Sequence, residues 1–201
     1  MFQLSKAVRQ LFYINIAVFI IGYLLESVNF PFIQSFALLP KEGFMPHQLI
    51  THMFLHGGIL HIVFNMLALI SIAPPVEDYF GYRKFILYYL LCGLGGAFLH
   101  MFMVNSSVPM LGASGAIFGI VLIFTILNPN QKLFLFGIFG MKAKYIFSLM
   151  LAGELYAAFC IHGDGIGHFC HLGGALTGAL LLAFDKYVLS QLPQETKKRW
   201  S

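Results

Sequence analysis

Residues 111–119 of the chain read Leu-Gly-Ala-Ser-Gly-Ala-Ile-Phe-Gly, which places Ser114 between glycines at the start of an apolar run. The first N–H groups of a helix have no partner within that helix, and they lie at the positive end of its dipole. A hydroxyl in this position is beside donors that can stabilise an oxyanion. Taken alone, Gly-x-Ser-Gly is a weak motif, because the same small residues also allow close packing of membrane helices.

The composition points to a membrane protein. Of the 201 residues, 59% are hydrophobic and only 10% are charged, whereas about a quarter of the residues in a soluble domain are charged. Because so few polar side chains cannot cover a globule in water, we expect an integral membrane protein. The basic residues stand in short clusters between apolar runs and form no patch interleaved with aromatic residues, so no nucleic acid is expected as a partner.

Six apolar segments have the length of a helix, and we expect each of them to cross the bilayer. They cover residues 10–27, 56–73, 84–104, 113–127, 142–160 and 167–185. Pro74 and Pro75 are expected to end the second segment, because proline interrupts helical hydrogen bonding. We therefore predict an all-α bundle of six transmembrane helices. It would form a single domain over residues 1–201, with a core at about 10–185 and a short tail at 186–201.

The basic residues predict how the bundle is oriented. Six spans put both termini on one side of the membrane, and eleven of the twelve lysines and arginines lie on that side. Only Lys41 lies on the other. Since cytoplasmic loops carry the excess of Lys and Arg, both termini and the tail are expected in the cytoplasm.

The same orientation brings three reactive side chains to one depth. Spans two, four and six begin at the outer face, and His61, Ser114 and His171 lie in their first turns. Span four makes about 22 Å of helix, against a hydrocarbon core of about 30 Å. Ser114 would then lie roughly 8–10 Å below the outer surface. Irregular backbone at that depth must line protein or water, so we expect a water-filled pocket open to the outside.

Small residues suggest how His171 could reach Ser114. Gly174 and Gly178 follow His171 at i+3 and i+7, on its helical face, and Gly115 and Gly119, four residues apart, follow Ser114. Glycines let two helix backbones approach closely, so these faces could meet and bring the imidazole to the hydroxyl. A neutral imidazole could then accept the serine proton. The alternative is a purely structural, hydrogen-bonded histidine.

His61 and Asn65 are four residues apart and therefore share a helical face. Both can donate hydrogen bonds, and two donors aimed at one point suit a developing oxyanion. The alternative role is to hold neighbouring helices together, which is common for His and Asn in membranes.

Together these motifs resemble the rhomboid family of intramembrane serine proteases, over about residues 45–185. The resemblance rests on the order of six spans and on three motifs: Gly112-Ala113-Ser114-Gly115, His61 and Asn65 with His56 five residues ahead of His61, and His171 ahead of Gly174 and Gly178. It implies Ser114 as nucleophile and His171 as general base, a dyad without an acidic third member. It also implies that the oxyanion is bound by His61, Asn65 and the backbone N–H of Ser114, beside Gly112.

The resemblance further implies substrates that are themselves membrane helices, cut near the outer face beside small residues. Supporting roles would fall to His56, Phe118 and the glycines at positions 115, 119, 174 and 178. The chain departs from the family in two places. Phe118 stands where the family often has a tyrosine packed on the catalytic histidine, and residues 29–48 lack the Trp-Arg pair usual in the loop before span two.

Glu154 is unexpected within span five, since a charge there is costly. It would be protonated or paired with a polar group on a neighbouring span, and we expect its role to be structural.

Two other interpretations remain open at this stage. Eight histidines, several near the outer face, would also suit a haem or metal protein, although HExxH and paired histidines with carboxylates are missing. A catalytically inactive relative could bind membrane helices, but Ser114 and His171 are both present.

The leading prediction is thus an intramembrane serine endopeptidase that needs no cofactor and no metal. Its partners would be the lipid bilayer and membrane proteins with a transmembrane helix, and short loops favour a bacterial inner membrane. The sequence predicts neither the physiological substrate nor the oligomeric state.

Overall fold

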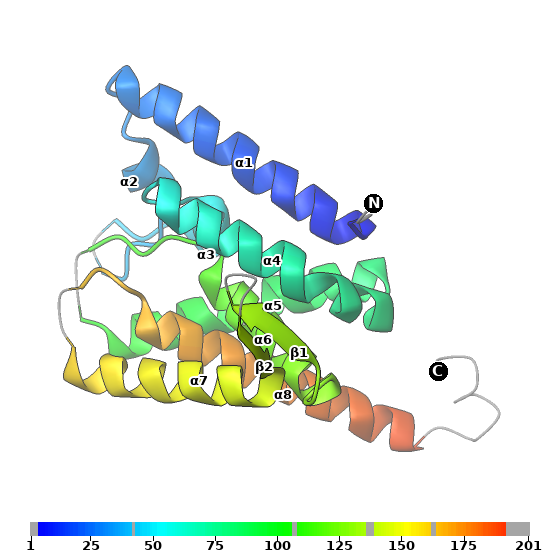
Figure 1. The fold of residues 1–201 in the computed structure, drawn as a ribbon. Helices are drawn as coiled ribbons and strands as arrows, with labels where there is room; N and C mark the ends of the chain where they lie inside the picture. The colour runs from blue at the N-terminus through cyan, green and yellow to red at the C-terminus, as the bar shows by residue number, and fades with distance from the viewer. Residues whose placement is uncertain (1–3, 42, 106–107, 136–138, 162–163, 192–201) are drawn as a thin grey trace.

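The structure is a computed structural model that describes residues 4–41, 43–105, 108–135, 139–161 and 164–191. The helical elements, shown in Figure 1, are α1 (Lys6–Ser27), α2 (Phe32–Phe36), α3 (Gln48–Thr51), the 3-10 turn η1 (His52–Phe54), α4 (Ile59–Phe80), α5 (Tyr82–Met103), α6 (Ser114–Leu127), α7 (Ala143–Cys160) and α8 (His168–Gln191). Two short strands, β1 (Lys132–Leu135) and β2 (Phe139–Lys142), form an antiparallel pair between α6 and α7. The sequence analysis did not predict this pair.

Five of the described helices are long and apolar enough to cross a membrane: α1, α4, α5, α7 and α8. The sixth apolar helix, α6, has 14 residues and is shorter, about 21 Å at 1.5 Å per residue. The chain is thus a mainly helical membrane protein. The start of α1 and the end of α8 lie on the same side of the bundle (Figure 1).

The predicted end of the second span is wrong. Pro74 and Pro75 lie inside α4, which continues to Phe80. The end of α4 is held by α1, because the Glu77 carboxylate accepts hydrogen bonds from the N–H of Ala7 at 2.8 Å and of Val8 at 2.9 Å. This contact caps the start of α1 and anchors the helix beyond the prolines, so tertiary structure overrides the local break.

The sixth helix is also longer than predicted, because α8 runs past Asp185 to Gln191. Asp185 forms an ion pair with Lys84 at the start of α5, which neutralises both charges. Of the predicted tail at 186–201, the first part is therefore helical, and residues 192–201 lie outside the described part of the chain.

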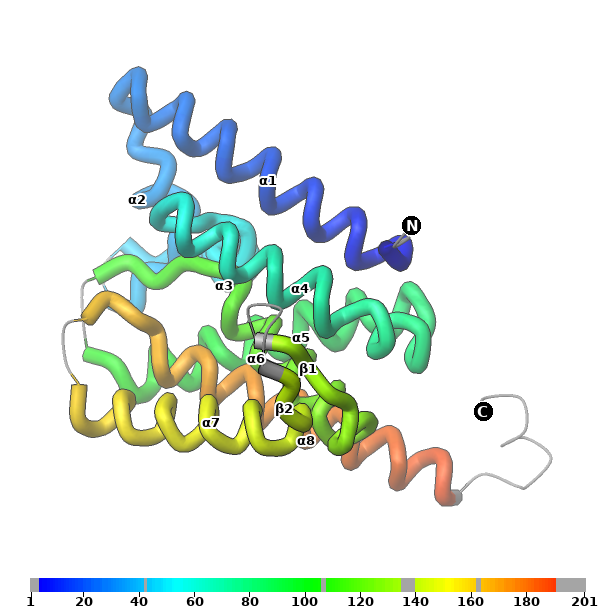
Figure 2. Tube along the Cα trace, viewed as in Figure 1, coloured from blue at the N-terminus to red at the C-terminus, as the bar shows by residue number. Residues whose placement is uncertain are grey.

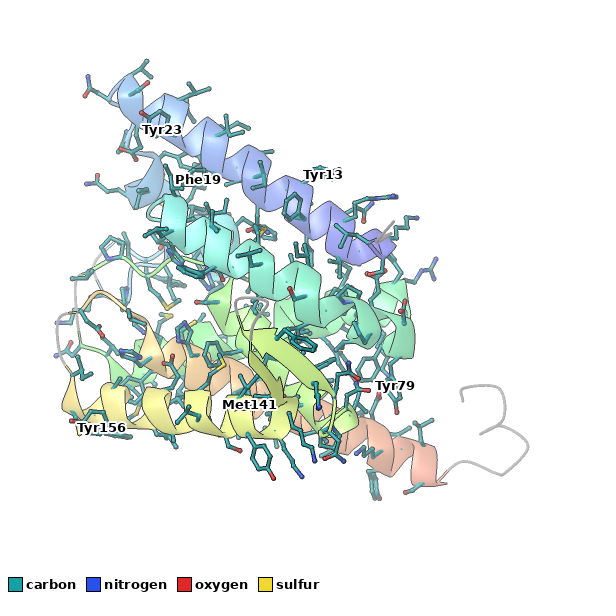
Figure 3. All side chains as sticks on the ribbon, viewed as in Figure 1. Tyr13, Phe19, Tyr23, Tyr79, Met141 and Tyr156 are labelled. Carbon is teal, nitrogen blue, oxygen red and sulfur yellow. The ribbon has the colours of Figure 1, made fainter. Side chains whose placement is uncertain are left out.

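The outward faces of the long helices carry large apolar side chains. Examples are Tyr23 on α1, Leu149 on α7 and Phe184 on α8, which are 73%, 72% and 63% exposed. Figure 3 shows the aromatic side chains along α1 and Tyr156 on α7. So much exposed apolar surface exceeds what a soluble monomer shows, whereas the hydrocarbon of a bilayer solvates it.

At the centre of the bundle lies α6, which packs against α4, α5 and α8. Figure 2 shows it between α4 and α8. Most of its side chains are buried, including Ile120, Ile123 and Phe124. The central position of α6 fixes where its first residue, Ser114, stands.

Glycines set the distance between α6 and α8. A Cβ atom added to Gly174 would collide with the carbonyl oxygen of Gly115, and one added to Gly178 would lie 2.6 Å from the carbonyl oxygen of Gly119. The two backbones are therefore in direct contact over two turns. The approach predicted from the glycine spacing is present in the structure.

We expect Gly174→Ala to destabilise the protein by about 1–3 kcal/mol, because its methyl group would meet backbone that cannot move aside without separating the helices. The measurement is reversible unfolding of the purified protein in mixed detergent micelles. Gly153→Ala on α7 is the matched control, since a Cβ there meets nothing within 4 Å. Equal stability of the two variants would contradict the role given to the α6–α8 contact.

Candidate active site

A cavity of about 910 Å³ lies among the starts of α4, α6 and α8. Its walls include His61, Asn65, Ser114 and His171. The last turns of α5 and α7 and parts of the segments before α6 and before α8 complete them. The structure thus gathers in one cavity the polar side chains that the sequence analysis singled out on separate helices.

Ser114 and His171 are within hydrogen-bond distance across the α6–α8 contact. The Oγ atom of Ser114 lies 2.7 Å from Nε2 of His171, and the histidine is buried. The Phe118 ring stacks on the imidazole with 4.4 Å between ring centroids and 4° between planes. Phe118 lies one helical turn beyond Ser114, so α6 supplies both the hydroxyl and the apolar surface that fixes the plane of the histidine.

His61 faces the same point from α4. Its Nδ1 atom accepts a hydrogen bond of 3.4 Å from the N–H of Gly57. In a neutral imidazole the other nitrogen, Nε2, then carries the proton. This nitrogen lies next to Gly112, since a Cβ there would be 2.8 Å from Nε2 and 3.7 Å from Oγ of Ser114. A donor and the serine hydroxyl therefore flank the same small space.

Gly112 has φ +129°, which L side chains rarely adopt. Its position is fixed by the loop before α4. The Gly112 N–H donates to the carbonyl oxygen of His52 at 2.9 Å, and Leu38 and Met110 exchange two backbone hydrogen bonds of 2.9 Å. These backbone hydrogen bonds hold the loop at residues 29–48, which lacks the Trp-Arg pair, against the segment before α6.

Asn65 lies one turn after His61 and is buried. Its Nδ2 atom donates to the carbonyl oxygen of His61 at 2.9 Å. An amide nitrogen has a second N–H, and since Asn65 lines the cavity, a ligand there can accept it. At the start of α6, the N–H of Ser114 belongs to the first helical turn, where no partner within the helix is available.

His56 supports His61 rather than reaching the serine. The two rings meet edge to face with 5.0 Å between centroids. His56 is buried, and burial lowers its pKa to about 4, so it is neutral at pH 7. Burial likewise lowers the pKa of His52 to about 4, and its Nδ1 donates to the carbonyl oxygen of Gln48 at 2.7 Å.

Three side chains lie on the far side of His171: Glu154, for which the sequence analysis expected a structural role, and His168 and Asp164, which it missed. Glu154 reaches from α7, and its Oε2 lies 3.0 Å from Nδ1 of His171 and 2.7 Å from Nδ1 of His168. The other nitrogen of His168 lies 2.9 Å from Oδ2 of Asp164. Two signals could have found the cluster. His168 precedes His171 by three residues on one helical face, and Glu154 is about 9 Å of helix from the C-terminal end of α7.

Comparison with known proteins assigns the family. The rhomboid domain model matches residues 44–187. The chain is 36% identical to RHOMBOID-like protein 2 of Arabidopsis thaliana over 134 residues, which is 67% of this chain and 40% of that protein. It is 38% identical to the rhomboid protease GluP of Bacillus subtilis over 133 residues, 65% of this chain and 24% of that protein.

A longer alignment joins it to the mitochondrial rhomboid protein 1 of Saccharomyces cerevisiae, with 27% identity over 193 residues, 92% of this chain and 54% of that protein. The chain thus spans about half or less of the length of these relatives. The matched region contains α4 to α8 through residue 187, and hence the five helices that line the cavity. The chain belongs to the rhomboid family of integral membrane proteins.

Proposed function

We propose that the chain is an intramembrane serine endopeptidase that cuts transmembrane helices of other membrane proteins near the outer membrane face. The observation that carries the proposal is the 2.7 Å contact between Ser114 Oγ and His171 Nε2 in the wall of a large cavity. Membership of a family that includes proteins named as rhomboid proteases and serine proteases supports it.

The proposed reaction is acyl transfer. Nε2 of His171 takes the proton as Ser114 Oγ attacks the carbonyl carbon of the scissile bond, and then delivers it to the leaving amine. The acyl-enzyme is released by a water molecule that the same nitrogen deprotonates. Ser114 is the nucleophile and His171 the general base.

The oxyanion formed in this attack needs donors near Gly112. Three donors are assigned to it. Nε2 of His61 borders the space beside the serine hydroxyl, Nδ2 of Asn65 lines the same cavity one turn further along α4, and the N–H of Ser114 belongs to the nucleophile itself. Gly112 keeps that space open. His56 packs against the ring of His61, and Phe118 packs against the ring of His171.

The proposal includes six membrane crossings with both termini in the cytoplasm. Under this topology the short α6 starts within the outer half of the bilayer, and the cavity gives water access to the serine. The bacterial inner membrane is retained as the proposed location. Relatives from plants and mitochondria show that the family occurs elsewhere too.

We expect Ser114→Ala to abolish cleavage of a transmembrane substrate in liposomes, because no other group replaces the nucleophile. Substituting His171 by Ala should do nearly the same. Ser27→Ala is the matched control, since Ser27 lies at the exposed end of α1 and bonds only its own helix. Cleavage by the Ser114 variant at the wild-type rate would refute the mechanism.

Loss of either side-chain donor should slow the reaction without stopping it. We expect His61→Ala and Asn65→Ala each to lower kcat by about 10–1000-fold, a range that includes the loss of about 100–1000-fold typical of one oxyanion donor. Rates from single-turnover cleavage in liposomes would measure this. Unchanged rates in both variants would remove these residues from the oxyanion site.

Gly112→Ala tests the space beside the serine. The new methyl group would press on Nε2 of His61, and the positive φ adds about 1–3 kcal/mol of backbone strain. We expect kcat to fall by about 10–1000-fold in folded protein. Gly58→Ala is the control, because Gly58 is extended and has nothing within 4 Å of an added Cβ. Equal rates in the two variants would contradict the assignment.

A further inference from the structure

The carboxylate of Glu154 links the catalytic histidine to a second histidine. Oε2 lies within hydrogen-bond distance of Nδ1 of His168, at 2.7 Å, and within ion-pair distance of Nδ1 of His171, at 3.0 Å, so one oxygen atom lies beside both rings. The side chain of Glu154 is 16% exposed and projects from α7, a helix that crosses the membrane. An ionised group at this place is costly unless it is paired, and both potential partners lie on α8.

The contact falls on the nitrogen of His171 that faces away from the serine. To accept the proton of Ser114, Nε2 must be unprotonated, and Nδ1 then carries the hydrogen. A carboxylate beside Nδ1–H favours this tautomer and stabilises the imidazolium formed during the attack. Phe118 fixes only the plane of the ring, and Glu154 opposes its rotation within that plane.

His168 and Asp164 complete the cluster. Each nitrogen of the His168 ring lies beside a carboxylate oxygen: Nδ1 is 2.7 Å from Glu154 and Nε2 is 2.9 Å from Asp164. Since carboxylates only accept hydrogen bonds, this arrangement suits the imidazolium, in which both nitrogens carry a proton. A hydrogen bond from the backbone N–H of Ile166, and to a lesser extent one from His168, lowers the pKa of Asp164, so this carboxyl is ionised at pH 7. The carboxylates of Glu154 and Asp164 together with the imidazolium of His168 have a net charge of −1. When His171 takes up the proton of Ser114, its imidazolium neutralises this charge.

We propose that Glu154 is a positioning residue that extends the Ser114–His171 dyad to a triad, and that His168 and Asp164 hold its carboxylate in place. This inference rests on the proposed function of the same site. Two other titratable side chains interact with the charge of His171: His61 on α4 and His100 on α5. Both are bases, so among the described residues the carboxylate that lies beside the His171 ring is that of Glu154.

The test compares kcat and KM of Glu154→Gln with those of the wild type in liposomes. We expect a fall in kcat of about 10²–10⁴-fold, with KM little changed. Glu154→Asp should recover part of the lost kcat, because it returns a carboxylate to the same helix position. A merely structural role would not distinguish Asp from Gln at this position.

Glu26→Gln is the matched control. Glu26 lies at the outer end of α1 and accepts a hydrogen bond from the N–H of Ile33, away from the cavity. It should keep the wild-type rate within about twofold. His168→Gln should lower kcat less than Glu154→Gln, and Asp164→Asn least, because each is one contact further from the serine. Thermal unfolding of every variant checks that it is folded.

Two results would overturn the inference. One is a Glu154→Gln enzyme with wild-type kcat while Ser114→Ala is inactive, which would leave the proposed function standing. The other is a stoichiometric divalent metal in the purified wild type that Glu154→Gln loses, since ligand atoms of Glu154, His168 and His171 lie within 4.8 Å of one another. An inactive wild type would instead refute the proposed function itself.

Discussion

The direct contact between the backbones of α6 and α8 is the constraint on which the site depends. Side chains at Gly115 or Gly174 would push the helices apart and with them Ser114 and His171. Because the contact lies within the first turns of both helices, it sets the distance between hydroxyl and imidazole without any long side chain. The same contact buries α6 between its neighbours, so a helix too short to match the bilayer is stabilised by protein rather than lipid.

Hydrogen bonds hold several of the polar groups around this contact in place. His61 bonds to Gly57, Asn65 to its own helix, and the loop before α4 to the segment before α6 through backbone. Such pairing keeps the site in one geometry before any substrate arrives, and preorganised donors are what stabilise a developing charge. In the same way, the proposed cluster of Glu154, His168 and Asp164 is in place to stabilise the positive charge that forms on His171.

Much of this architecture could be predicted because its signals are local in sequence. Runs of apolar residues mark the helices, and spacing of three and four residues marks the faces that carry His61, Ser114 and His171. The course of α4 past Pro74 could not be predicted, since it depends on Glu77 reaching α1, seventy residues away. Glu154 was taken as structural for a similar reason. Which face of α7 meets α8 is set by packing, and a helix that is apolar nearly all round does not encode it.

The central claim is that this packing makes Ser114 an activated nucleophile. It is tested most directly by treating the solubilised protein with a fluorophosphonate and mapping the modified residue by mass spectrometry. The account predicts a single phosphonyl adduct on the peptide that contains Ser114, formed in the wild type and absent when His171 is replaced by Ala. Folded wild type without the adduct, or an adduct that forms equally well without His171, would contradict it.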